Sequence, residues 1–468
     1  MTRSGEFTKI VTTIGPASFS KTMLNSFVAL GVDLMRLNAS HGTLDEHKEV
    51  IKHIRAISRK RGREVGIILD LPGPKIRLGV LPEGFLLTRS HTVALRWLPK
   101  AEVKRAVAID VPAALAPFIK NRAVVAIDDG KVQLLVREVK KGYALASVLA
   151  GGEVTSHKGV SIMGVDLPLP AITAKDEEAM SLAPLVDFVA VSFIKSANDI
   201  RLFKKKLAGQ TKGAKVPPQV IAKIETAAAL KNLDEIIEEV DAIMVARGDL
   251  GLSIDPAMLG LAQKEIVLKS RKLGKPVIVA TQMLDSMTLR PLPTRAEILD
   301  VTNAVIDHVD AVMLSSESAS GQYPREAVKL MAHISDLVEK SPLNNLTLDS
   351  LDNTFGPEHF FAHFLVDFVQ SHRIRVIFNE DGDEVLAKLV SGHRIEAHQV
   401  VPVTDIHKAR QLNLVWGVTP VVAKNKMDLK TNLLTASKMF RKGQVILVIG
   451  IHREKNKKQP YARLQKII

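Results

Sequence analysis

One stretch of the chain, residues 221–254, contains two carboxylates and a lysine. Together these side chains could bind a cation and an anion. Lys223 and Glu225 stand two positions apart in a short β-branched run, and Asp249 follows a second apolar run. Side chains two positions apart on a strand project from the same face, so the ammonium and the first carboxylate should lie side by side. Carboxylates without a Cys or His cluster suit a hard, oxygen-binding cation, and the ammonium suits an anionic substrate. An isolated Lys-x-Glu is more often an exposed salt bridge, so this interpretation depends on the rest of the chain.

The residues around this group predict the elements that must position it. Residues 219–225 and 241–247 are apolar runs typical of strands, and residues 226–240 have helical spacing. In a parallel strand that is buried on both faces, charges are tolerated only at an open end. We therefore expect Lys223, Glu225 and Asp249 at the carboxyl ends of neighbouring parallel strands.

Strand-like runs that end in small or polar residues recur along the chain, with helical segments between them. They cover residues 8–15, 33–40, 65–71, 187–193, 219–225, 241–247, 276–281 and 311–316. Eight parallel strands alternating with helices are typical of a (β/α)8 TIM barrel, whose active site lies at the carboxyl ends of the strands. One Ser or Asp there would be explained by helix capping, but a whole set at corresponding ends favours a site. The set is Arg36, Asn38, Ser40, Asp70, Ser192, Lys223, Glu225, Asp249, Thr281 and Ser315.

The spacing of these runs divides the chain into domains. We predict an α/β fold in which residues 1–71 and 169–340 form the barrel and residues 72–168 form an inserted, small all-β (β-barrel) lid domain. Asp129-Gly130 and Lys141-Gly142 mark hairpins in the insertion, which could swing over the strand ends and exclude water. Residues 341–356 are predicted as a linker and residues 357–468 as a C-terminal α/β domain. We interpret its basic stretch, residues 452–458, as a solvated turn, with anion or partner binding as the alternative.

The composition restricts the class of protein and its partners. Of the 468 residues, 46% are hydrophobic and 24% charged, as in globular proteins, and the absence of Cys excludes disulfides, thiolate metal sites and cysteine nucleophiles. No apolar run reaches the roughly 18 residues that span a bilayer, and the first residues lack the apolar core of a signal peptide. We therefore expect a cytoplasmic protein without membrane contacts. The net charge of +14 is spread over helical segments and only three Tyr and two Trp could stack on bases, which favours anionic small molecules over nucleic acid.

With these residues in view, the chain resembles the pyruvate kinase family along nearly its full length. The matching blocks are TKIVTTIGPAS, MRLNASHG, DLPGPKIRLG, HKGVSI, VSFI, AKIE, MVARGDLG, ATQMLDSM, PTRAE and LSSESASGQYP, in the family's order. After about Lys340 the match weakens. The resemblance implies transfer of the phosphoryl group of phosphoenolpyruvate to ADP, giving pyruvate and ATP in the last step of glycolysis. It also implies a homotetramer.

The resemblance also implies roles for individual residues. Glu225 and Asp249 would hold Mg²⁺ (or Mn²⁺), while Lys223 and Arg36 would offset charge on the phosphoryl group in flight. Backbone N–H groups of Gly248 and Asp249 would bind the substrate carboxylate, and Thr281 with Ser315 would serve protonation of the enol. The positions that match the nucleotide side are Asn38, His41, Arg77 and Lys158.

Some residues depart from the family pattern. Ala39 replaces the usual Phe, Ser316 and Ser318 replace Gly and Thr, and Ser253 stands where an acidic residue is common. None of them removes a charge that the chemistry needs, so we expect activity, at a rate that these changes could reduce. Two alternatives stay open: another Mg²⁺-dependent barrel enzyme acting on phosphoenolpyruvate or pyruvate, such as a lyase, and a catalytically weak paralogue that serves as a basic binding protein.

Two further departures concern ions and effectors. K⁺-dependent relatives bind the ion with Asn, Ser, Asp and Thr oxygens. This chain keeps the first three as Asn38, Ser40 and Asp70, but Leu71 replaces the Thr. Lys75 replaces a Glu that these relatives carry a few residues later. Because an ammonium can take the ion's electrostatic role, we predict that K⁺ is not required. Where relatives bind a sugar phosphate, residues 379–384 carry four carboxylates, so we predict a solvated turn and no activation by fructose 1,6-bisphosphate.

Overall fold

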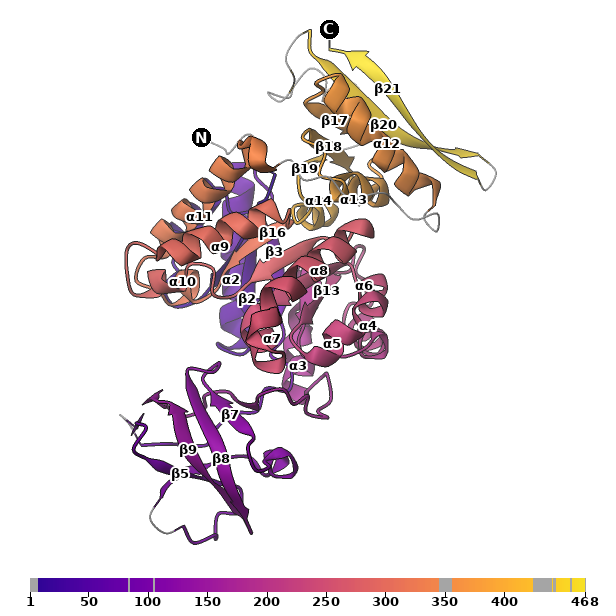
Figure 1. The fold of residues 1–468 in the computed structure, drawn as a ribbon. Helices are drawn as coiled ribbons and strands as arrows, with labels where there is room; N and C mark the ends of the chain where they lie inside the picture. The colour runs from indigo at the N-terminus through magenta and orange to yellow at the C-terminus, as the bar shows by residue number, and fades with distance from the viewer. Residues whose placement is uncertain are drawn as a thin grey trace.

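The computed structural model describes residues 7–82, 85–103, 106–344, 356–423, 440, 443–454 and 457–467. It has three parts, arranged in a row in Figure 1: an all-β part at the bottom, a barrel in the middle and an α/β part at the top. The all-β part and the α/β part therefore adjoin opposite ends of the barrel. The exact domain limits given above stay predictions.

Eight parallel strands close into a barrel, which confirms the predicted fold class. Each predicted run contains one strand, and neighbours pair in the order β1-β2-β3-β12-β13-β14-β15-β16 and back to β1. The strands are β1 (Lys9–Ile14), β2 (Leu34–Asn38), β3 (Gly66–Asp70), β12 (Phe188–Val191), β13 (Gln219–Ile224), β14 (Ala242–Ala246), β15 (Val277–Ala280) and β16 (Ala311–Leu314).

Helices and short 3-10 turns surround the barrel. They are α1 (Lys21–Ala29), α2 (Leu44–Arg61), α3 (Ala174–Ala179), η2 (Met180–Leu185), α4 (Ala197–Gln210), α5 (Ala227–Lys231), α6 (Leu233–Glu239), α7 (Arg247–Ser253), η3 (Pro256–Met258), α8 (Leu259–Lys272), η4 (Asp285–Thr288), α9 (Arg295–Ile306), α10 (Ser316–Ala319), α11 (Pro324–Glu339) and η5 (Pro342–Asn344). Capping boxes start several of them, such as Thr43 with Glu46 and Thr294 with Glu297. Among the described residues, no helix is long and apolar enough to cross a membrane.

The single helix predicted over residues 226–240 is wrong in one respect, because it is broken at Asn232. Asn232 ends α5 with φ −102° and ψ 26°, outside the helical region. Its side-chain amide donates to the carbonyl oxygen of Lys195, 2.8 Å away. A short polar side chain that bonds elsewhere competes with helix continuation, which the apolar spacing alone does not reveal.

The interior of the barrel is a packed core. It is filled by apolar side chains that alternate along the strands, as expected for a barrel of this size. They are Val11, Leu34, Ile68, Phe188, Ala190, Ile221, Ala242, Met244, Ile278, Ala280, Ala311 and Met313, joined by Leu414 from the C-terminal part.

The insertion between β3 and α3 is an all-β unit with its own core. A six-stranded sheet has the order β11-β7-β8-β9-β5-β6, and β10 pairs with β4. The elements are β4 (Leu86–Leu87), β5 (Thr92–Arg96), β6 (Val107–Asp110), η1 (Ala113–Phe118), β7 (Val124–Ile127), β8 (Val132–Lys140), β9 (Tyr143–Ala150), β10 (Gly152–Glu153) and β11 (Val160–Ile162). Both predicted hairpins are present, and Gly130 and Gly142 take the positive φ that such turns require.

The C-terminal part is a five-stranded sheet of order β19-β18-β17-β20-β21 with helices packed on it. Its elements are α12 (Pro357–Ser371), β17 (Val376–Asn379), α13 (Glu384–Gly392), β18 (His398–Val403), α14 (Ile406–Leu412), β19 (Val418–Val422), β20 (Val445–Glu454) and β21 (Lys457–Lys466). The four parallel strands were predicted, but the antiparallel β21 was not. Its sequence, KKQPYARLQK, has few apolar residues because it forms an edge of the sheet.

The two stretches interpreted as solvated turns differ in outcome: residues 380–381 do form a turn, with Asp381 exposed, whereas the basic stretch is mostly strand. Most of the basic stretch 452–458 belongs to β20 and β21, and residues 455–456 lie outside the described residues. In the acidic loop, Glu380 accepts from Tyr461 Oη and pairs with Arg463 at 2.8 Å, and Asp381 accepts from the backbone N–H of Ile451 at 2.7 Å. The loop is held by its own protein partners, which come from strands distant in the sequence.

Buried polar contacts dock the C-terminal part on the barrel. The Arg394 guanidinium donates to the carbonyl oxygen of His308 at 2.7 Å and pairs with Asp310 at 2.7 Å. Asp310 also accepts from the backbone N–H of Trp416. These charges are buried and paired with each other. Separating the two parts would therefore expose them to solvent or leave them without a partner.

Candidate active site

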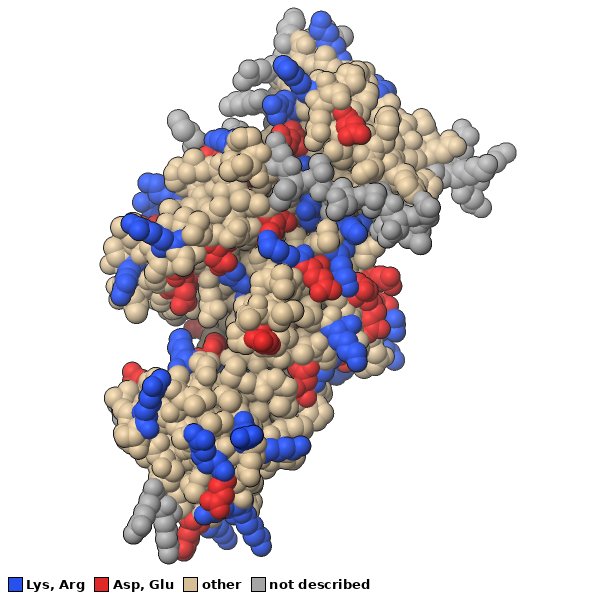
Figure 2. All heavy atoms as spheres, viewed as in Figure 1, with Lys and Arg blue, Asp and Glu red and all other residues tan. Residues whose placement is uncertain are grey.

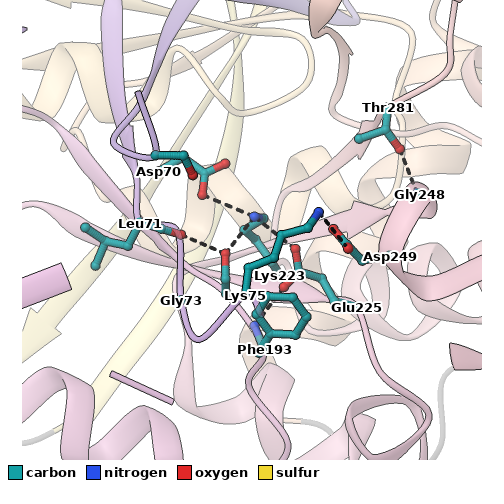
Figure 3. Close-up of polar contacts among 12 residues, drawn as sticks. Asp70, Leu71, Gly73, Lys75, Phe193, Lys223, Glu225, Gly248, Asp249 and Thr281 are labelled. Carbon is teal, nitrogen blue, oxygen red and sulfur yellow. Dashed lines mark hydrogen bonds and ion pairs between the residues drawn. The ribbon is translucent and has the colours of Figure 1, made fainter. Parts of the chain in front are cut away.

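Lys223 lies at the centre of a buried group of charges at the strand ends (Figure 3). Its Nζ is 2.9 Å from Glu225 Oε1, 3.2 Å from Asp70 Oδ1 and 2.7 Å from Ser192 Oγ. Asp70 is the last residue of β3, whereas Glu225 and Ser192 directly follow β13 and β12. Burial alone would lower the pKa of Lys223, but the charges of Asp70 and Glu225 outweigh it and raise the pKa. Lys223 is therefore a cation.

Arg36 and Lys223 share one carboxylate. Arg36 Nε lies 2.6 Å from Asp70 Oδ2, so the two oxygens of Asp70 face two different cations. Burial would raise the pKa of Asp70, but the nearby charges of Arg36 and Lys223 lower it. Arg36 also donates to Thr13 Oγ1 at 3.0 Å. The fixed carboxylate holds the guanidinium and the ammonium on one side of the site, where an anion can meet both.

The other expected metal ligand, Asp249, is held from the all-β part. Lys75 Nζ lies 3.2 Å from Asp249 Oδ1 and 2.9 Å from Asp129 Oδ1. Among the described residues Lys75 contacts these two carboxylates rather than Asn38, Ser40 or Asp70, the residues of the expected monovalent-ion site. The neighbouring Leu71 contributes its carbonyl oxygen, which accepts from Ser192 Oγ at 2.7 Å.

The two carboxylates fit a divalent cation. Burial raises the pKa of Glu225, and the charge of Asp249 raises it further against the effect of Lys223. Two carboxylates that repel each other across a site are relieved by a cation between them. Among the described residues no group of three His, Cys, Asp or Glu side chains forms a closed metal site, so further ligands would come from substrate or water.

Thr281 and Gly248 meet at one edge of the site (Figure 3). The backbone N–H of Gly248 donates to Thr281 Oγ1 at 2.9 Å. Ser315 follows β16; its backbone N–H donates to Glu317 at 2.7 Å, and its Oγ is buried without a hydrogen-bond partner among the described residues. No hydrogen bond links Ser315 to Thr281 in the described residues, so a relay between them would need an added group.

The residues expected on the nucleotide side form a positive region. Asn38 Oδ1 accepts from the backbone N–H of Ser40 at 3.1 Å, and Arg77 donates to the carbonyl oxygen of His157 at 3.0 Å. Lys158 of the all-β part pairs with Asp128 at 2.9 Å. The pKa of His41 is lowered by burial and then by four nearby positive charges, those of Arg77, Lys175, Arg36 and Lys158. This field suits a polyanion.

A cavity of about 90 Å³ lies between the all-β part and the barrel. Glu225 and Asp249 line the cavity together with Lys75. Apolar residues of the two segments that connect the all-β part to the barrel form much of the remaining wall. Figure 2 shows the molecular surface hollowed between these two parts, at the left edge of the view. The fold and the polar residues at the strand ends place the chain in the class of (β/α)8-barrel proteins with charged side chains gathered at the carboxyl ends of the strands.

Comparisons with known proteins identify the family. A family model described as "Pyruvate kinase, barrel domain" matches residues 6–328. The chain belongs to the pyruvate kinase family and is a phosphotransferase.

Relatives match over almost the whole chain. A pyruvate kinase of Methylorubrum extorquens is 38% identical, with 95% of this chain and 94% of the relative covered. One from Agrobacterium vitis is 36% identical, with 96% and 95% covered. A crystal structure of a pyruvate kinase from Cryptosporidium parvum superposes with a TM-score of 0.86 at 28% identity, covering 99% of this chain and 96% of that one.

The departures from the family pattern are accommodated locally. Ser318 donates to the carbonyl oxygen of Thr13 at 2.9 Å, so its hydroxyl is used in the barrel wall. Ser253 donates to Asp166 at 3.1 Å, at the junction with the all-β part. Ala39 is buried. None of these residues contacts Lys223, Glu225 or Asp249.

Three residues of the site were given no role from the sequence. Ser192 was in the set of polar strand ends, and its position after β12 was a usable signal. Lys175 donates to the carbonyl oxygen of Ser40 at 2.9 Å from the start of α3, which no spacing indicated. Arg247, buried at the end of β14, bonds to the backbone that carries Thr281. Arg247 lies in the MVARGDLG block, in which roles were predicted only for Gly248 and Asp249.

Proposed function

We propose that this site transfers the phosphoryl group of phosphoenolpyruvate to ADP, giving pyruvate and ATP in the last step of glycolysis. The observation that carries the proposal is the sharing of Asp70 by Arg36 and Lys223 beside Glu225. Arg36 and Lys223 are two cations fixed beside a carboxylate that would help to hold a metal, and such an arrangement suits a phosphoryl group whose charge the side chains and the metal would offset.

Glu225 and Asp249 would hold Mg²⁺ or Mn²⁺. The carboxylate oxygens of both residues, and the raised pKa of Glu225, which the charge of Asp249 helps to raise, support this assignment. When bound, such a cation supplies positive charge to the oxygens of the transferring phosphoryl group. The contacts Lys223–Glu225 and Lys75–Asp249 would loosen to free carboxylate oxygens for it.

Lys223 and Arg36 would act on the phosphoryl group itself. Both are held against Asp70, so little reorganisation is needed when charge moves in the transition state. The backbone N–H groups of Gly248 and Asp249 would receive the substrate carboxylate. The N–H of Gly248 already donates to Thr281 Oγ1, so the carboxylate would share or replace that acceptor.

Protonation of the enol would fall to the Thr281 side of the site. Thr281 would present its hydroxyl toward the substrate carbon, and the buried Ser315 hydroxyl would join through a water. The nucleotide would lie along Asn38, His41, Arg77 and Lys158, where the positive field supports phosphate binding. The all-β part would move as a lid, because Lys158 belongs to it and Lys75 belongs to a segment that connects it to the barrel.

The remaining features follow from the family resemblance. We propose that the enzyme works as a homotetramer in the cytoplasm and that K⁺ is not required, because the Lys75 ammonium beside Asp249 already supplies a positive charge at the site. Phosphoenolpyruvate, ADP, ATP and pyruvate are its partners, and no role for nucleic acid or membranes is proposed.

A coupled assay with phosphoenolpyruvate, ADP and Mg²⁺ tests the proposal. ATP should form in a ratio of one to one with pyruvate. Pyruvate without ATP would indicate a different phosphoenolpyruvate enzyme, and no turnover despite saturable ligand binding would indicate a binding protein.

A further inference from the structure

Thr281 and Gln282 have an unusual backbone conformation. Directly after β15 their φ angles are 69° and 54°, in the left-handed region. A β-branched residue rarely adopts this region, and the strain of such a residue must be offset by surrounding contacts. The sequence offers no glycine at either position, so other residues must hold this turn.

One buried arginine supplies the contacts. Arg247 is 7% exposed at the junction of β14 and α7. Its Nη2 donates to the carbonyl oxygens of Thr281 at 2.6 Å and of Gln282 at 3.1 Å, and its Nε donates to Thr281 O at 3.2 Å. The guanidinium thus binds the backbone of both left-handed residues.

The arginine is itself fixed from the other side. Nη1 pairs with Asp300 of α9 at 2.7 Å and approaches Gln263 of α8 at 3.5 Å. A planar guanidinium with partners on both edges cannot rotate without losing several charge-assisted hydrogen bonds. Its position is therefore set by two helices that do not take part in the site.

The same short segment also holds the Thr281 side chain. Gly248, the residue after Arg247, donates its backbone N–H to Thr281 Oγ1. Backbone and hydroxyl of Thr281 are consequently fixed by two consecutive residues, and the hydroxyl direction depends on the turn that Arg247 stabilises.

We propose that Arg247 is a positioning residue that sets the direction of the Thr281 hydroxyl for protonation of the enol. This inference rests on the proposed function. In that reaction the P–O bond of phosphoenolpyruvate breaks, a P–O bond to the terminal oxygen of ADP forms, and the enolate takes a proton at its methylene carbon on the Thr281 side, giving pyruvate. Arg247 touches neither the substrate nor the proton.

The test uses the full-length enzyme with Arg247→Lys and Arg247→Met. A displaced catalytic group can cost about 10²-fold, so kcat should fall by about this factor while KM for phosphoenolpyruvate stays nearly constant. Lysine keeps the positive charge but lacks the planar guanidinium whose N–H groups reach both carbonyl oxygens. Arg247→Lys should therefore not bring kcat back to the wild-type value.

The decisive readout is the face on which the enol is protonated. Phosphoenolpyruvate stereospecifically labelled at the methylene carbon, turned over in isotopically labelled water, gives pyruvate with a chiral methyl group when the enzyme delivers the proton. The wild type should give one configuration and the Arg247 variants a mixture, because solvent reaches the released enol from both faces. Lost stability alone would not change the configuration.

Arg55→Met is the matched control. Arg55 also bonds to backbone carbonyls, those of Val65 and Leu185, and pairs with Asp187, but it lies at the opposite end of the strands. The Arg55→Met substitution should lower Tm while leaving kcat and the configuration of the product methyl group unchanged. If Arg247→Met does not fold, Arg247→Lys, which keeps charge and stem, decides the question.

The outcomes separate the inference from the proposed function. A wild type that makes no ATP overturns the proposed function and this inference with it. An active wild type whose Arg247 variants keep a single methyl configuration, whatever their kcat, overturns the inference alone.

Discussion

Lys75 Nζ lies 3.2 Å from Asp249 Oδ1, so an ammonium from the chain crossing into the all-β part contacts one of the two expected metal ligands. The same nitrogen contacts Asp129 at the tip of the β7–β8 hairpin. Burial would lower the pKa of Lys75, but the two carboxylates outweigh it and raise the pKa. The positive charge of Lys75 thus joins the insertion to the edge of the barrel that carries Asp249.

We predict activity without K⁺ because of this charge. With a bulky organic cation as the only monovalent ion, kcat should be close to its value in K⁺. Lys75→Glu should lower kcat in the organic cation, because it places a third carboxylate beside Asp249 and Asp129. The exposed Lys131→Glu, in the same hairpin, is the charge-matched control. A strong rise in wild-type kcat on adding K⁺ would contradict the prediction.

Lys223→Met should abolish most turnover. A cation placed against developing phosphoryl charge acts mainly in the transition state, so kcat should drop by about 10³-fold or more with little change in KM. The buried Lys9, whose Nζ donates to the carbonyl oxygen of Val418 at 2.8 Å, offers the control Lys9→Met with unchanged kcat. A loss below about tenfold for Lys223→Met would mean that the lysine is structural.

The barrel and much of the site could be predicted from the sequence because both follow local rules. Strand runs with polar ends repeat along the chain, and Lys223 and Glu225 share a face by alternation alone. The contacts of Lys75 could not be predicted, because they depend on where the insertion docks. Likewise β21 has an edge-strand composition, and the partners of Glu380 come from that strand. What was missed depends on tertiary contacts between segments distant in sequence.

Fructose 1,6-bisphosphate should not activate the enzyme through residues 379–384. Glu380 and Asp381 are engaged with β20 and β21, Asp383 caps α13, and Glu384 pairs with Lys408 at 2.6 Å. Displacing these contacts to admit a dianion beside four carboxylates is unfavourable. Titration at sub-saturating phosphoenolpyruvate should leave the saturation curve unchanged. A sigmoidal curve that turns hyperbolic, with binding lost on mutation of this loop, would disprove the prediction.

Stability should fall between pH 7 and pH 5. Burial, followed by the nearby His363 and Arg271, lowers the pKa of His393 to about 4, and burial beside Lys9 lowers the pKa of His398 to about 4. Between pH 6.5 and 4 the unfolded state therefore binds more protons, so stability is present above pH 6.5 and lost on acidification. For His393 this amounts to about 2 kcal/mol by pH 5.

Denaturant titration at both pH values checks this prediction. His393→Gln should reduce the loss between pH 7 and pH 5, whereas replacing the half-buried His91, whose Nδ1 accepts from the backbone N–H of Thr88, should leave it unchanged. An equal loss in the His393 variant would assign the effect to other groups.

Leu414 belongs to the loop after α14, yet it completes the apolar interior of the barrel. During synthesis on the ribosome all eight barrel strands emerge before this residue does. The all-β insertion, with a core of its own, can fold while the chain is still growing. Without the C-terminal part the barrel would lack this side chain, so the strand ends opposite the active site would stay uncovered.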